Sequence, residues 1–139
     1  MWLWFAAAGL LTTALVAQSI TEQFVVALPD GSGDVDVTTR VWEWFLPHIL
    51  PTLGVVGGVG AFAQAGVTDV PDPSKFRYAA LLSGFYLSLL ALSVLRIPIT
   101  DGDPLPSLER ANLWLGPAQG LAAGGLSLFF ATSRPERER

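Results

Sequence analysis

Residues 42–65, WEWFLPHILPTLGVVGGVGAFAQA, decide the fold of this chain. Beyond Glu43 the stretch holds no Asp, Glu, Lys or Arg, and at about 1.5 Å per helical residue it is long enough to cross the hydrocarbon core of a bilayer. It opens with two tryptophans, a residue type enriched where a membrane helix meets water. The stretch therefore predicts a transmembrane helix.

Two prolines, Pro47 and Pro51, flank His48, which is the only histidine of the chain. Each proline lacks a backbone N–H, so the carbonyls of Glu43 and Pro47, four residues earlier, lose their helical partners. A membrane helix tolerates such gaps where a neighbouring helix or water supplies the missing bond. We therefore expect a weakened helical turn around His48.

The composition outside this stretch points to the same environment. Hydrophobic residues make up 51% of the 139-residue chain, charged residues only 14%, and the mean hydropathy is +0.48. Soluble domains carry about 25% charged residues. Because the charges cluster between long neutral runs, we expect one integral membrane domain over residues 1–139. The lack of cysteine excludes disulfides and thiolate chemistry.

Four apolar runs, each with no more than two charged residues, are long enough to be membrane helices. They cover about residues 2–28, 42–65, 76–95 and 108–131, and a polar tail occupies 132–139. Short polar connections favour antiparallel neighbours. The predicted fold is therefore all-α, a four-helix antiparallel transmembrane bundle. Residues 29–41 are expected to form a polar loop with a tight turn or a short hairpin, and Ser107 is expected to cap the last helix.

The flanking basic residues predict the orientation. Five of the eight Lys and Arg residues lie beside the N-terminus, the 67–75 loop and the tail, and three lie on the other side. Cytoplasmic segments carry the excess of positive charge, so both termini are expected in the cytoplasm of a cell whose inner or plasma membrane holds this multi-pass chain. Membrane lipid is its expected surrounding. The net charge of −4 excludes a nucleic-acid surface.

Folding four helices up and down brings Glu22, His48, Arg110 and Asn112 to one level in the non-cytoplasmic leaflet. An imidazole near a carboxylate and a guanidinium can shuttle protons or orient a polar head group, so these four are the candidate catalytic residues. The alternative is structural: the arginine reaches the interface, and His48 only satisfies a free carbonyl. With one histidine and no cysteine, neither a metal nor a cofactor is expected.

Small residues recur at four-residue spacing in three of the four predicted helices, which lets another backbone approach closely. Their first interpretation is packing inside the bundle. The second is a face for other membrane subunits or a homo-oligomer, across which Gln64 and Gln119 would bond. The residues are Gly54, Gly58, Ala61, Ala80, Gly84, Ser88, Gly116, Gly120 and Gly124.

Four short motifs, ITEQFVVALP, WFLPHILP, RIPITDG and ERANLWLGPAQGLA, are similar to those of the anthrone oxygenase-like family of small four-helix membrane proteins. The resemblance implies cofactor-independent oxidation or binding of a flat hydrophobic molecule, with Glu22, His48, Arg110 and Asn112 as the carried-over candidates. The chain departs from the family where Thr100-Asp101 follows the proline motif and where Arg110 precedes Trp114.

Three classes of function remain open from the sequence. The favoured one is an accessory or scaffold subunit that packs on partner membrane helices. The alternative is a small membrane enzyme, or a binder of a hydrophobic small molecule, with an outer-leaflet pocket at His48 and Glu22. The second alternative is an oligomeric channel or transporter component, in which Glu22 would supply the carboxylates at the mouth.

Overall fold

In the computed structural model of the protein, the described residues are 2–21, 23–27, 33–63, 73–99 and 103–131. This part of the chain is helical apart from one small hairpin, which confirms the all-α prediction. Its elements are α1 (Trp2–Ile20), β1 (Val25–Ala27), β2 (Asp34–Asp36), α2 (Thr38–Ala63), α3 (Pro73–Leu95), the 3-10 turn η1 (Ile97–Ile99) and α4 (Leu105–Ala131).

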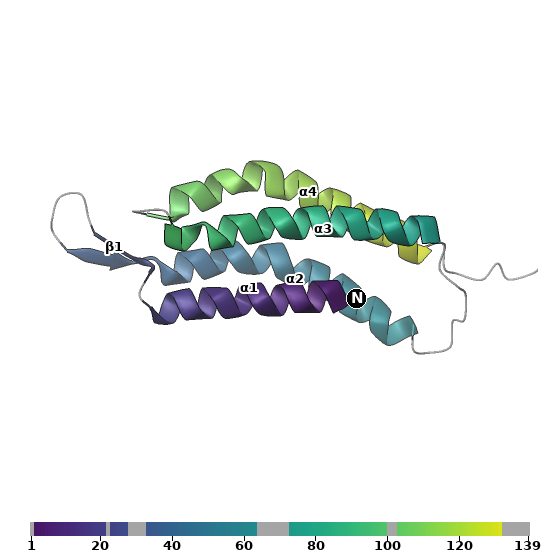
Figure 1. Ribbon diagram of the computed structural model, residues 1–139, viewed down its shortest axis with the longest axis horizontal. Coiled ribbons are helices and arrows are strands. Elements are labelled where there is room, and N and C mark those ends of the chain that lie inside the picture. Colours follow the sequence, from purple (N-terminus) through teal and green to yellow (C-terminus); the bar gives the residue numbers. More distant parts are fainter. Residues whose placement is uncertain (1, 22, 28–32, 64–72, 100–102, 132–139) are drawn as a thin grey trace, which may run out of the picture.

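Successive helices run in opposite directions, and all four lie roughly along the long axis of the molecule (Figure 1). The most extensive contact joins α3 to α4, while α1 packs on α2 and α3, and α2 packs on α4. Each helix therefore has two main neighbours. The β1–β2 hairpin projects from the end of the bundle where α1 stops and α2 begins (Figure 1).

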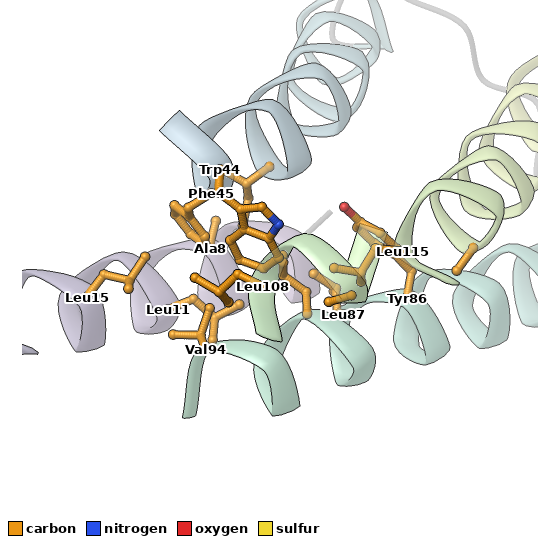
Figure 2. Close-up of a cluster of buried hydrophobic side chains, with 14 of the residues drawn as sticks. Ala8, Leu11, Leu15, Trp44, Phe45, Tyr86, Leu87, Val94, Leu108 and Leu115 are labelled. Carbon is orange, nitrogen blue, oxygen red and sulfur yellow. The ribbon is translucent and has the colours of Figure 1, made fainter. Parts of the chain in front are cut away.

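The core is an apolar seam along the bundle axis. Figure 2 shows leucines of α1 and α4 meeting aromatic side chains from α2 and α3. Four of these side chains, Leu15, Phe45, Tyr86 and Leu115, are fully enclosed. The enclosed positions recur every three or four residues along each helix, as one face of an α-helix requires.

The first helix is shorter than the predicted span 2–28. It ends at Ile20, and the valines that we expected to continue it form β1, which pairs antiparallel with β2 in the register Val26↔Val35. β-branched residues favour strands, and pairing with β2 supplies partners that a helix end lacks. The hairpin expected within residues 29–41 is found only in part, because its second strand lies there and its first strand is residues 25–27. Gly33, at φ +145°, leads into β2 in a conformation that favours glycine.

Two aspartates cap the helices that start at the hairpin end. Asp36 accepts a hydrogen bond from the Thr38 N–H at 2.8 Å, and Asp103 accepts one from Leu105 N–H at 2.9 Å. Hydrogen bonds from the side chain and the backbone N–H of Thr38 lower the pKa of Asp36. The predicted cap, Ser107, instead donates to the carbonyl of Pro104 at 2.7 Å. The prediction was wrong because α4 begins at Leu105, three residues earlier than the sequence pattern indicated.

Within the described residues, two helical segments are long and apolar enough to cross a membrane: Trp2–Ile20 and Ser74–Ile99. The other two long helices, α2 and α4, each contain charged and polar side chains and at least one proline: Arg40, Glu43 and His48 in α2, and Glu109, Arg110 and Asn112 in α4. All four helices expose large apolar side chains, among them Trp2 at 87%, Leu81 at 73% and Leu113 at 76%.

Candidate functional site

The prolines of α2 organise the polar groups of the bundle. Both Pro47 and Pro51 lie inside α2, as expected, and the carbonyl of Pro47 receives the side-chain amide of Gln119 from α4 at 3.5 Å. Gln119 thus bonds within its own chain, where the sequence indicated a bond across an intermolecular contact. The hydroxyl of Tyr86, on α3, donates to the carbonyl of His48 at 2.6 Å. Neighbouring helices therefore hold this segment of α2 from two sides.

His48 is half-buried and tightly positioned. Its Nδ1 lies 2.7 Å from the carbonyl oxygen of Trp44, one turn earlier, and its ring lies over the Trp44 indole with centroids 4.8 Å apart. A carbonyl only accepts hydrogen bonds, so Nδ1 carries a proton, and Nε2 is the acceptor nitrogen of the corresponding uncharged tautomer. Nε2 makes no hydrogen bond to any residue that the structure describes.

Asn112 of α4 meets the same indole. Its Oδ1 accepts a hydrogen bond from Trp44 Nε1 at 2.8 Å, which orients the side-chain amide, so that its NH2 group faces away from Trp44. Asn112 is exposed, whereas Trp44 is buried. Figure 2 shows Trp44 with its indole nitrogen at the edge of the apolar cluster, and the Tyr86 hydroxyl raised on the same side. Trp44 is therefore the residue that joins His48 to Asn112.

The structure brings together half of the predicted catalytic set. His48 lies over the Trp44 ring and Asn112 lies at its N–H edge, while Arg110 is exposed near the start of α4, and Glu22 lies outside the described residues. No carboxylate or guanidinium joins His48 among the contacts of the described chain. The observed polar group therefore contains aromatic and amide side chains instead of the acid and base that the sequence suggested.

Two members of this group were missed by sequence reasoning. Trp44 precedes His48 by four positions, so helical periodicity could have placed both on one face. Tyr86 lies in an apolar run of α3, and nothing in the sequence marks it as a partner of α2. Its role depends on how the helices pack.

An ion pair joins α2 to α4 at the hairpin end. Arg40 Nη2 lies 3.6 Å from Glu109 Oε1, and both side chains are more than 60% exposed. A pair this exposed contributes little to stability. In the part of the chain that the structure describes, no three metal-ligating side chains come together.

A second candidate surface is the outward side of α4. Gly116, Gly120 and Gly124 are all exposed, and a Cβ atom built on any of them would meet nothing within 4 Å. We call these three residues the glycine face. They do not pack inside the bundle, so the first interpretation of their spacing was wrong for α4.

The other predicted small residues behave similarly where the structure describes them. Gly54 and Gly84 have open space around a built Cβ, Ala80 is half-buried, and Ser88 is exposed. The surroundings of Gly58 and Ala61 lie outside the described part.

Close packing inside the bundle occurs at a different glycine. A Cβ on Gly125 would lie 2.9 Å from Leu82 Cδ1 and 3.6 Å from Ala79 Cα, so α3 and α4 approach each other through this residue. Gly125 is adjacent in sequence to the glycine face but points inward. Spacing alone did not separate the two roles, because a stripe at four-residue intervals does not state which side of the helix it occupies.

Comparison of the chain with protein-family models, curated proteins and solved structures finds no match. The function is therefore argued from the surfaces described above.

Proposed function

We propose that the protein is an integral membrane protein whose four helices all cross the bilayer, with both termini in the cytoplasm. Two helices are long and apolar enough to do so. In addition, Leu10, Leu92, Leu113 and Leu121, from three different helices, are each more than half exposed. Soluble monomers rarely expose apolar patches of this extent, whereas lipid tails would cover them at no cost.

Within that membrane, we infer that the protein is an accessory or scaffold subunit that packs on transmembrane helices of a partner. The glycine face carries this proposal. Gly116, Gly120 and Gly124 form an uninterrupted small-residue stripe, and no side chain of the described bundle fills the space beside it. Lipid tails are as apolar as leucine, so membrane helices associate through close backbone packing, which glycine permits.

The proposal is tested by substituting Gly120, the central residue of the glycine face. Gly120→Leu would place a bulky side chain in the contact, so proteins that co-purify with the wild-type chain in mild detergent should be lost. The matched control is Gly9→Leu on α1, because Gly9 is also exposed with nothing within 4 Å of a built Cβ but belongs to no stripe. A wild-type chain that purifies alone as a monomer would overturn the proposal.

A second candidate function is binding of a hydrophobic small molecule, as the family resemblance implies. The observation that favours it is the pair of polar groups held by Trp44: the acceptor Nε2 of His48 and the amide NH2 of Asn112. A molecule whose hydroxyl donates a hydrogen bond to His48 Nε2, and which accepts one from the Asn112 NH2 group, would match them. His48→Phe should then lose a compound that organic solvent extracts from the wild-type protein, and Tyr78→Phe, at an exposed position on α3, should retain it. An extract without any such compound would argue against this function.

A further inference from the structure

Three buried side-chain polar atoms have no hydrogen-bond partner among the described residues: Trp4 Nε1, Gln18 Oε1 and Ser83 Oγ. The two that belong to the most deeply buried residues are Nε1 of Trp4, on α1, and Oγ of Ser83, on α3. Both residues are only 2% exposed. An indole N–H can only donate and a hydroxyl can donate and accept, so the two atoms are complementary in chemistry. A polar group buried without a hydrogen bond is unfavourable, which makes their position informative.

Both residues are neighbours of Tyr86. The Trp4 indole stacks on the Tyr86 ring, with centroids 5.9 Å apart and planes inclined by 30°. Ser83 precedes Tyr86 by three positions, so the two lie one turn apart on the same buried face of α3. The Tyr86 hydroxyl already donates its proton to the His48 carbonyl. Tyr86 therefore has no proton left to donate to Ser83.

Ser83 differs from other hydroxyl residues of these helices. Five of them donate to the carbonyl four residues earlier, at 2.7–2.9 Å: Thr13, Ser19, Ser88, Ser93 and Ser127. Ser83 does not bond back in this way, although Ala79 precedes it by the same four residues. Its hydroxyl is thus available to a partner in the interior of the bundle.

We propose that one buried water molecule bridges Trp4 Nε1 and Ser83 Oγ between α1 and α3. The indole N–H would donate to the water oxygen, and the water would exchange a hydrogen bond with the serine hydroxyl. Buried waters typically make two to four such bonds to groups that are otherwise unsatisfied. Both residues are almost completely buried, so a bridging ligand has to be small, and water is the smallest ligand that both donates and accepts hydrogen bonds. This bridge ties the first turn of α1 to α3 and does not depend on the proposed partner function.

The first test is a double-mutant cycle on unfolding in detergent micelles. Trp4→Phe and Ser83→Ala each remove one partner of the water, and the double variant removes both. If they share the water, the combined effect on the unfolding equilibrium constant should differ from the product of the single effects by about threefold or more. The control cycle pairs Trp4→Phe with Ser88→Ala, since Ser88 is exposed and bonded to its own helix. Independent effects in the Ser83 cycle would overturn the proposal.

The second test keeps the tryptophan and so remains valid if Trp4→Phe fails to fold. In the wild-type protein labelled with 15N at tryptophan, the Trp4 indole proton should show a cross-relaxation peak to a long-lived water. Ser83→Ala should weaken that peak, and Ser88→Ala should leave it unchanged. An indole proton of Trp4 that shows no contact with water in the folded wild-type protein would rule out the bridge.

Discussion

Tyr86 concentrates several roles in one side chain. It stacks on Trp4 of α1 and donates a 2.6 Å hydrogen bond to the backbone of α2 beside the two prolines. The substitution Tyr86→Phe removes only the hydroxyl, so it should keep the ring stacking on Trp4 and lose the hydrogen bond to the His48 carbonyl. We expect the free energy of unfolding to fall by about 0.5–1.5 kcal/mol, the usual net value of such a bond.

The chain supplies its own control, because its other tyrosine, Tyr78, is 55% exposed on the same helix. Tyr78→Phe should leave stability unchanged in the same detergent unfolding assay. Equal effects of the two substitutions would mean that the bond to the His48 carbonyl contributes nothing.

For single residues, the sequence indicated some of the polar side chains that lie close together, but it did not indicate all of their contacts. His48 and Asn112 were expected at one level of the bundle, and both now lie against Trp44. The lost backbone bond at Pro47 was also expected, and Gln119 fills it. What could not be predicted is the tautomer of His48 or the role of Tyr86, because both depend on side-chain geometry across helices.

At the scale of single elements, two neighbouring glycines of α4 should respond in opposite ways. Gly125→Leu would force a side chain against Leu82 and Ala79, so we expect the bundle to lose about 1–3 kcal/mol of stability from overpacking. Gly124→Leu faces open space and should preserve stability. Unfolding of both variants in detergent compares them directly. A stable Gly125→Leu protein would show that α3 and α4 are not in close contact there.

The observed ends of the helices show that a sequence pattern alone does not predict where each helix stops. The last turns of the predicted span 2–28 are apolar enough to continue a helix, but their valines pair with residues 34–36 instead. That competition depends on a partner strand, which local periodicity does not include. The direction of the glycine face was unpredictable for a related reason: α4 is apolar on both sides, so hydrophobicity does not distinguish the core from the surface.

For the whole molecule, the decisive prediction concerns the side of the membrane on which each end of the bundle lies. The chain has no cysteine, so single cysteines can be labelled without background. Asp34→Cys and Asp103→Cys lie at the hairpin end and should react with a membrane-impermeant thiol reagent on intact cells. Lys75→Cys, at the opposite end, should react only after lysis.

This pattern follows from the excess of basic residues beside the tail and the 67–75 loop. Equal labelling of all three positions on intact cells, or labelling of Asp34→Cys and Asp103→Cys from different sides, would contradict a four-span protein.

Five hydroxyl groups donate hydrogen bonds to carbonyls of their own helix, and these bonds affect the hydrophobicity of the helix surfaces. Ser88 and Ser127 both point outward, yet each proton is already committed to a carbonyl of the preceding turn. Residue-based hydropathy scales count serine as a polar side chain. Here, however, each hydroxyl already donates its hydrogen bond to a backbone carbonyl of the same helix. In a bilayer, the outward surface of α3 and α4 would therefore be less polar than their amino-acid content suggests.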